Sequence, residues 1–110
     1  MRAIVMHDFG GPEVLRLAEI AATAPGSGEV RVAVAAAAVN PVDIQTRRGI
    51  DREHIRAPFP MILGWDLAGT VETVGDGVAA WQPGDRVIAM SAQAATGWGP
   101  TRKRSPWTPL

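Results

Sequence analysis

The chain has 110 residues, and its 11 acidic and 11 basic side chains leave a formal net charge of zero. That balance, with 46% hydrophobic residues, is typical of a globular protein and indicates neither nucleic acid nor an anionic membrane as a partner. There is no cysteine, which excludes disulfides and thiolate metal ligands. No apolar run approaches the roughly 20 residues that cross a bilayer, and the first residues lack a signal-peptide pattern. We therefore expect a cytoplasmic protein with one small domain.

The first third of the chain alternates β-type runs with glycine and proline turns. A strand is expected at residues 2–7, which form a short β-type run. Two more are expected at residues 14–20 and 29–35, where apolar side chains recur with period two. The alanines 35–38 could extend a helix by propensity, but the preceding period of two and the following Val39-Asn40-Pro41 favour a buried strand end. These elements predict a mostly β fold.

A short helix is predicted to begin after Asn40. Asparagine is a good capping residue, Pro41 suits the first helical position, and Asp43 lies in the first turn near the positive end of the helix dipole. Gly49 is expected to end this helix at about Arg48. Residues 50–60 are polar and rich in proline, which predicts a surface loop.

A second series of strands is expected from residue 62 onwards. It runs through residues 62–74, turns at 75–77 and again at 82–85, and continues as residues 86–90. Residues 97–110 differ in kind, with three of the nine prolines, three basic residues, no acids and no periodicity. We expect this stretch to be a tail outside the folded domain.

Three motifs carry a family resemblance: Val39-Asn40-Pro41-Val42-Asp43, the segment 64–69 that begins Gly64-Trp65-Asp66, and Gln82-Pro83-Gly84-Asp85-Arg86-Val87. Together they resemble the N-terminal, GroES-like catalytic domain of the medium-chain dehydrogenase/reductase superfamily, and within it the zinc-independent quinone and enone reductases. The resemblance implies a GroES-like partial β-barrel with one or two short helices over residues 1–96. It also implies a longer protein that includes a nucleotide-binding domain.

The tail then has two interpretations. The body uses arginine and never lysine, as a GC-rich gene would encode, and the composition changes sharply after Gly97. Residues 97–110 are interpreted either as the out-of-frame end of a once longer reductase or as a naturally disordered tail.

The resemblance also bears on zinc. Zinc-dependent members carry a histidine ligand where this chain has Trp65 and a cysteine ligand where it has Asn40. His7 and His54 belong to a strand and a charged loop, and neither has partners in the sequence that would make it a ligand. We expect no zinc.

Without zinc, the resemblance implies hydride transfer from NADPH to a quinone or an α,β-unsaturated carbonyl. It places Asn40, Pro41 and Asp43 near the nicotinamide and the substrate. Asn40 would contact the cofactor and offer its amide to a carbonyl on which negative charge builds, and Asp43 would organise the site or relay a proton. The alternative is that Asn40 and Asp43 only cap the helix, although one asparagine could do both.

Two further residues are candidates for the substrate pocket. Gln45 stands where many relatives have a tyrosine, and it can form hydrogen bonds but cannot act as a phenolic acid. Trp65 would form an apolar wall of the pocket, or alternatively a core residue between strands. Gly64 and Gly69 are expected to serve backbone geometry and close packing.

The sequence lacks a strand, glycine-rich turn and helix of the dinucleotide-binding type, so the chain alone is expected to hold NADPH weakly or not at all. By resemblance, the partners of the intact protein are a small-molecule quinone or enone and, in a homodimer, a second subunit. A hypothesis of another class is a non-catalytic truncated fragment or a small binding module.

Overall fold

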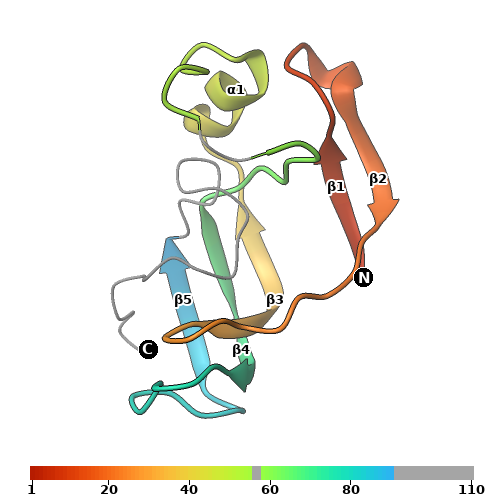
Figure 1. Ribbon diagram of the computed structural model, residues 1–110. Helices are drawn as coiled ribbons and strands as arrows, with labels where there is room; N and C mark the ends of the chain where they lie inside the picture. Colours follow the sequence, from red (N-terminus) through yellow and green to blue (C-terminus); the bar gives the residue numbers. More distant parts are fainter. Residues whose placement is uncertain (56–57, 91–110) are drawn as a thin grey trace. The chain divides into compact units, whose positions relative to one another are not determined.

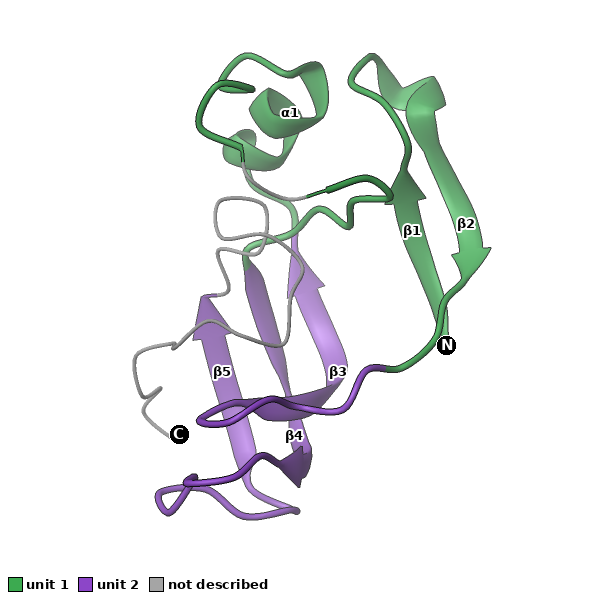
Figure 2. Cartoon of the chain, viewed as in Figure 1, with its two compact units in different colours: residues 1–22, 39–65, 91–98 green, residues 23–38, 66–90, 99–110 purple. Residues whose placement is uncertain are grey.

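The computed structural model describes residues 1–55 and 58–90, which form two compact units (Figure 2). Unit 1 contains Met1–Ala22 and Val39–Trp65, and unit 2 contains Thr23–Ala38 and Asp66–Met90. Figure 1 shows the elements in chain order, which are β1 (Arg2–Met6), the 3-10 turn η1 (Pro12–Val14), β2 (Leu15–Glu19), β3 (Val30–Ala38), α1 (Pro41–Arg48), β4 (Asp66–Val74) and β5 (Arg86–Met90). The mostly β prediction is confirmed. The predicted tail, residues 97–110, lies outside the described residues.

Unit 1 has a small core built from both of its chain segments. β1 pairs with β2 as an antiparallel hairpin, and Met6 also forms an isolated bridge with Met61 through two backbone hydrogen bonds of 2.8 Å. Both methionine side chains are fully buried. Phe9 packs against this pair and meets Phe59 edge to face, with ring centroids 5.2 Å apart. The core therefore joins the N-terminal hairpin to the segment that precedes β4.

The helix α1 begins and ends where the sequence predicts. Asn40 is its extended N-cap, Pro41 takes the first helical position, and Gly49 ends it in the left-handed conformation with φ 73°. The Gly49 N–H donates to the carbonyls of Gln45 and Thr46. A Cβ at position 49 would press into the ring of Phe9, so glycine is needed there for space as well as for the backbone angle.

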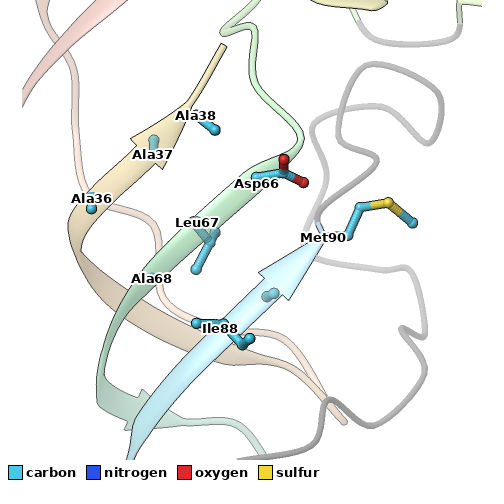
Figure 3. Close-up of a pocket in the computed structure, with 9 residues that line it drawn as sticks. Ala36, Ala37, Ala38, Asp66, Leu67, Ala68, Ile88 and Met90 are labelled. Carbon is cyan, nitrogen blue, oxygen red and sulfur yellow. The ribbon is translucent and has the colours of Figure 1, made fainter. Parts of the chain in front are cut away.

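Unit 2 is a three-stranded antiparallel sheet with β4 between β3 and β5. The alanine run is confirmed as strand, because β3 extends through Ala38. The expected burial of this run is wrong, since β3 pairs with β4 alone among the described strands and residues 35–38 are exposed, 36–38 of them at an open pocket of the sheet (Figure 3). Val71 on β4 and Val87 on β5 are its buried hydrophobic residues. At Gly69 a Cβ would collide with the carbonyl of Ala33 in β3, which confirms the expected close-packing role of this glycine.

The predicted strand 62–74 begins later than expected. β4 starts at Asp66, and residues 62–65 form no strand. Gly64 adopts φ 121°, a backbone angle outside the extended range of a strand, which separates the apolar residues before it from β4. In the described part of the chain, no helix is long and apolar enough to cross a membrane.

Candidate functional site

Asn40 and Asp43 are joined at the start of α1. The backbone N–H of Asn40 donates to Oδ2 of Asp43 at 2.7 Å, and the backbone N–H of Asp43 donates to the carbonyl oxygen of Asn40 at 3.0 Å. The carboxylate thus closes the first turn of the helix and lies at the positive end of its dipole. The structure brings together these two predicted site residues.

Asp43 is buried although it carries a carboxylate. Its residue is only 6% exposed, as is Thr46 one turn further along α1. Oδ1 of Asp43 is enclosed and has no hydrogen-bond partner within the described residues, whereas Oδ2 is held by Asn40. A buried carboxylate oxygen without a donor is costly, so this atom is an acceptor available to a water or a further donor at the site.

Arg47 fixes the orientation of α1 within unit 1. Its Nε donates to the carbonyl oxygen of Gly10 at 3.2 Å, and the Gly10 N–H donates to the carbonyl oxygen of Arg47 at 2.9 Å. This reciprocal pair attaches the helix to the turn after β1. This role of Arg47 was not predicted from sequence, where its only signal was a basic residue in the last turn of the helix.

Pro41 and Gln45 occupy the other side of the helix. Both are exposed, and their separation of four residues places them on one face, away from buried Asp43 and Thr46. The five predicted site residues therefore differ in burial. Asp43 is buried, its partner Asn40 is half-buried, and Pro41 and Gln45 are exposed. Trp65 lies on a separate segment.

Trp65 lies between Gly64 and the first residue of β4 and is half-buried. Its partial exposure is compatible with either predicted role, a pocket wall or a packed core residue. It belongs to unit 1, as do the four other predicted residues.

The residues that the structure describes form neither a metal-binding site nor a binding site for a pyrophosphate group. Among them, no three His, Cys, Asp or Glu side chains converge to hold a metal ion. The described strand pairs are all antiparallel, whereas dinucleotide sites use a parallel β-strand, glycine turn and helix. The N-terminus of α1 already carries the Asp43 carboxylate, which disfavours a second anion. The described residues therefore do not fit the pyrophosphate of NADPH.

Residues 26–105 match the alcohol dehydrogenase GroES-like domain family. The rat (Rattus norvegicus) quinone oxidoreductase is 46% identical over 93 residues, which cover 83% of this chain and 27% of the rat protein. The matched region includes most of the predicted partial barrel, so the expected GroES-like domain is confirmed.

The chain is also similar in fold to solved structures. An Escherichia coli quinone oxidoreductase in complex with NADPH aligns with a TM-score of 0.75 and 36% identity, over 84% of this chain and 28% of that one. An NAD-dependent alcohol dehydrogenase aligns with a TM-score of 0.72 and 44% identity, over 80% of this chain and 25% of that one. The chain spans about a quarter of the length of these proteins.

Proposed function

This chain belongs to the alcohol dehydrogenase GroES-like domain family, and we propose that it is the substrate-facing N-terminal part of a zinc-independent, NADPH-dependent oxidoreductase that reduces quinones or α,β-unsaturated carbonyls. The quinone oxidoreductase relatives support the reaction class. The observation within the chain that carries the proposal is the hydrogen-bonded pair of Asn40 and Asp43.

Asn40 is proposed to orient the substrate carbonyl. Reduction of a quinone or an enone builds negative charge on a carbonyl oxygen, and a fixed amide N–H that points at this oxygen lowers the barrier. An asparagine at an N-cap caps with its side-chain oxygen, while its amide nitrogen remains a separate donor. Capping and substrate binding can therefore coexist in one side chain.

Asp43 is proposed as a positioning residue. Its hydrogen bond fixes the backbone of Asn40, so the asparagine is held before substrate arrives. The enclosed Oδ1 can accept a second hydrogen bond from a water or a hydroxyl, which would extend the ordering toward the pocket. Pro41, Gln45 and Trp65 are proposed to shape the apolar and hydrogen-bonding walls around the ring of the substrate.

The nucleotide is proposed to be held mainly by polypeptide beyond this domain, since the described residues do not fit its pyrophosphate. The two similar structures point to different coenzymes. The quinone oxidoreductase is in complex with NADPH, whereas the alcohol dehydrogenase is NAD-dependent. Our choice of NADPH follows the quinone oxidoreductase. Contact between Asn40 and the nicotinamide is part of the proposal.

The test uses a fusion protein, which we name the joined protein. It consists of residues 1–90 of this chain followed by the part of the rat quinone oxidoreductase that lies beyond its matched segment. We expect the joined protein to oxidise NADPH in the presence of a naphthoquinone or an enone, and to use NADH less well. The rat protein is the positive control, and the 110-residue chain alone should show no turnover. A joined protein that melts cooperatively and binds NADPH but reduces neither substrate would favour a non-catalytic domain.

A further inference from the structure

The turn that follows β4 contains the one Asp-Gly dipeptide of the chain, Asp76-Gly77. Both residues are exposed. Within the described residues, the Asp76 carboxylate takes part in no hydrogen bond or ion pair, and the Gly77 N–H donates to no backbone carbonyl. A backbone nitrogen that belongs to glycine approaches a neighbouring side-chain carboxyl with little steric hindrance, because glycine has no Cβ. The two groups could therefore react with each other.

The conformation of the turn holds the two groups apart. Residues 75–78 are closed by a 3.4 Å hydrogen bond from the N–H of Val78 to the carbonyl oxygen of Gly75. Gly77 has φ 76°, and no described residue other than glycine has a positive φ, which makes this a type II turn. Such a turn places ψ of Asp76 at about +120°. The Gly77 nitrogen then points away from the Asp76 side chain.

The loop before β3 holds the peptide between Asp76 and Gly77 in this orientation. The carbonyl oxygen of Asp76 accepts from the Gly28 N–H at 2.8 Å and from Oγ of Ser27 at 3.3 Å. That oxygen and the Gly77 nitrogen belong to one rigid peptide plane. A rotation that brings the nitrogen to the Asp76 side chain must therefore move the oxygen away from both donors.

We propose that Asp76-Gly77 is a site of isoaspartate formation, and that the contacts of Ser27 and Gly28 with Asp76 limit its rate. In the first step the Gly77 nitrogen attacks Cγ of Asp76. A nitrogen–carbon bond forms, the bond from Cγ to its hydroxyl oxygen breaks, and one water leaves with the amide proton. The product is a five-membered succinimide ring.

Water then opens the ring at one of its two carbonyl carbons. Cleavage of the new bond restores aspartate, and cleavage of the original peptide bond gives isoaspartate, in which the main chain runs through Cγ. The water that left in the first step is returned in the second, so neither an oxidant nor a reductant is needed. In isoaspartate the former Asp76 carbonyl is a free carboxylate outside the peptide plane. The loop that contains Ser27 and Gly28 therefore loses a fixed acceptor. The modification uses no residue of the candidate site.

The test follows isoaspartate in the 110-residue chain during storage for several weeks at physiological pH and temperature. Electron-transfer mass spectrometry of proteolytic peptides distinguishes the two isomers. Asp51 is the internal control, because it is exposed and its carboxylate has no partner within the described residues, but arginine follows it. We expect isoaspartate to form faster at Asp76 than at Asp51. In Asp76→Glu the ring would have six members, and no isomer is expected at position 76.

Ser27→Ala tests the role of the loop. Loss of its hydrogen bond is expected to raise the rate at Asp76 about 2- to 5-fold while the rate at Asp51 is unchanged. Urea-unfolded chain gives a measurement without substitution, and isoaspartate should form faster at Asp76 there than in the folded chain.

Three results would overturn the proposal. A rate at Asp76 no higher than at Asp51 in the folded chain would show that the dipeptide is not a preferred site. An unchanged rate at Asp76 in Ser27→Ala, or an equal rise at Asp51, would remove the role of the loop contact. Equal rates at Asp76 in folded and unfolded chain would show that the turn gives no protection.

Discussion

Asn40 and Asp43 are linked by a 2.7 Å hydrogen bond from the backbone N–H of Asn40 to Oδ2 of Asp43. The same bond stabilises the first turn of α1 and fixes the residue proposed to meet the substrate. Because one contact serves both purposes, stability and activity must be measured on the same variants to separate them.

Substitutions at Asp43 should distinguish the stability that its capping hydrogen bond contributes from the stability that its negative charge contributes. Asp43→Ala removes the acceptor and is expected to lower the free energy of unfolding by about 1–2 kcal/mol. Asp43→Asn keeps an acceptor oxygen and loses mainly the favourable interaction with the helix dipole, so about 0.3–1 kcal/mol is expected. Urea titration gives both values, with exposed Asp51→Ala as the control. Equal losses for the two variants would contradict the capping role of the Asp43 carboxylate.

Gly69 should be intolerant of a methyl group. In Gly69→Ala the new Cβ would meet the carbonyl of Ala33, and displacing β3 is expected to cost about 1–3 kcal/mol. Gly28→Ala is the comparison, because open space surrounds the added group and only the backbone cost of its φ of 76°, about 1–2 kcal/mol, remains. Thermal melting of both variants measures the difference. A Gly69→Ala variant as stable as the parent would contradict the close approach of β3 and β4.

Binding of NADPH to the 110-residue chain should be weak. The described strands provide no unit of parallel strand, glycine-rich turn and helix. We therefore expect a dissociation constant in the millimolar range or above, which corresponds to a binding free energy of about 4 kcal/mol or less. Isothermal titration calorimetry measures it directly, with the Escherichia coli quinone oxidoreductase, whose structure contains NADPH, as the positive control. Micromolar affinity for the chain alone would reveal a nucleotide site that the described residues do not predict.

Zinc should be absent from the purified, untagged chain. The chain has no cysteine, and Asn40 and Trp65 stand where zinc-dependent members have ligands, so no tetrahedral set of soft ligands is expected. Elemental analysis should find far less than one zinc per chain, and a chelator should leave the melting temperature unchanged. One tightly held zinc per chain would contradict the zinc-independent assignment.

The helix was predictable from sequence because its determinants are local. Asn40, Pro41 and Gly49 each act within one turn, so their identities are enough to set both ends of α1. The burial of Asp43 was not predictable, because it depends on which side of the helix faces the rest of unit 1. That choice is fixed by the contacts of Arg47 with Gly10, which are 37 residues apart in sequence.

The strand register of unit 2 also required the structure. Alternation predicted strands at residues 86–90 and across the alanine run, but it could not pair Ile88 with Ala68 and Ala36. Register depends on contacts between distant strands, and a shift of one residue would have moved Ile88 and Met90 to the opposite face. The late start of β4 had a local signal in Gly64, which adopts a positive φ. A glycine permits such an angle but does not require it, so the signal alone could not locate the start of the strand.

The most direct test of the proposed site is the turnover of the joined protein carrying Asn40→Ser. Serine caps helices about as well as asparagine, so the free energy of unfolding should change by less than about 0.5 kcal/mol, while the amide donor is lost. We predict that kcat for NADPH-dependent reduction of a naphthoquinone falls about 100-fold, the scale for loss of one oxyanion donor. A variant that is equally stable and retains kcat within about twofold, well below that scale, would show that Asn40 only caps the helix and would contradict the proposed role.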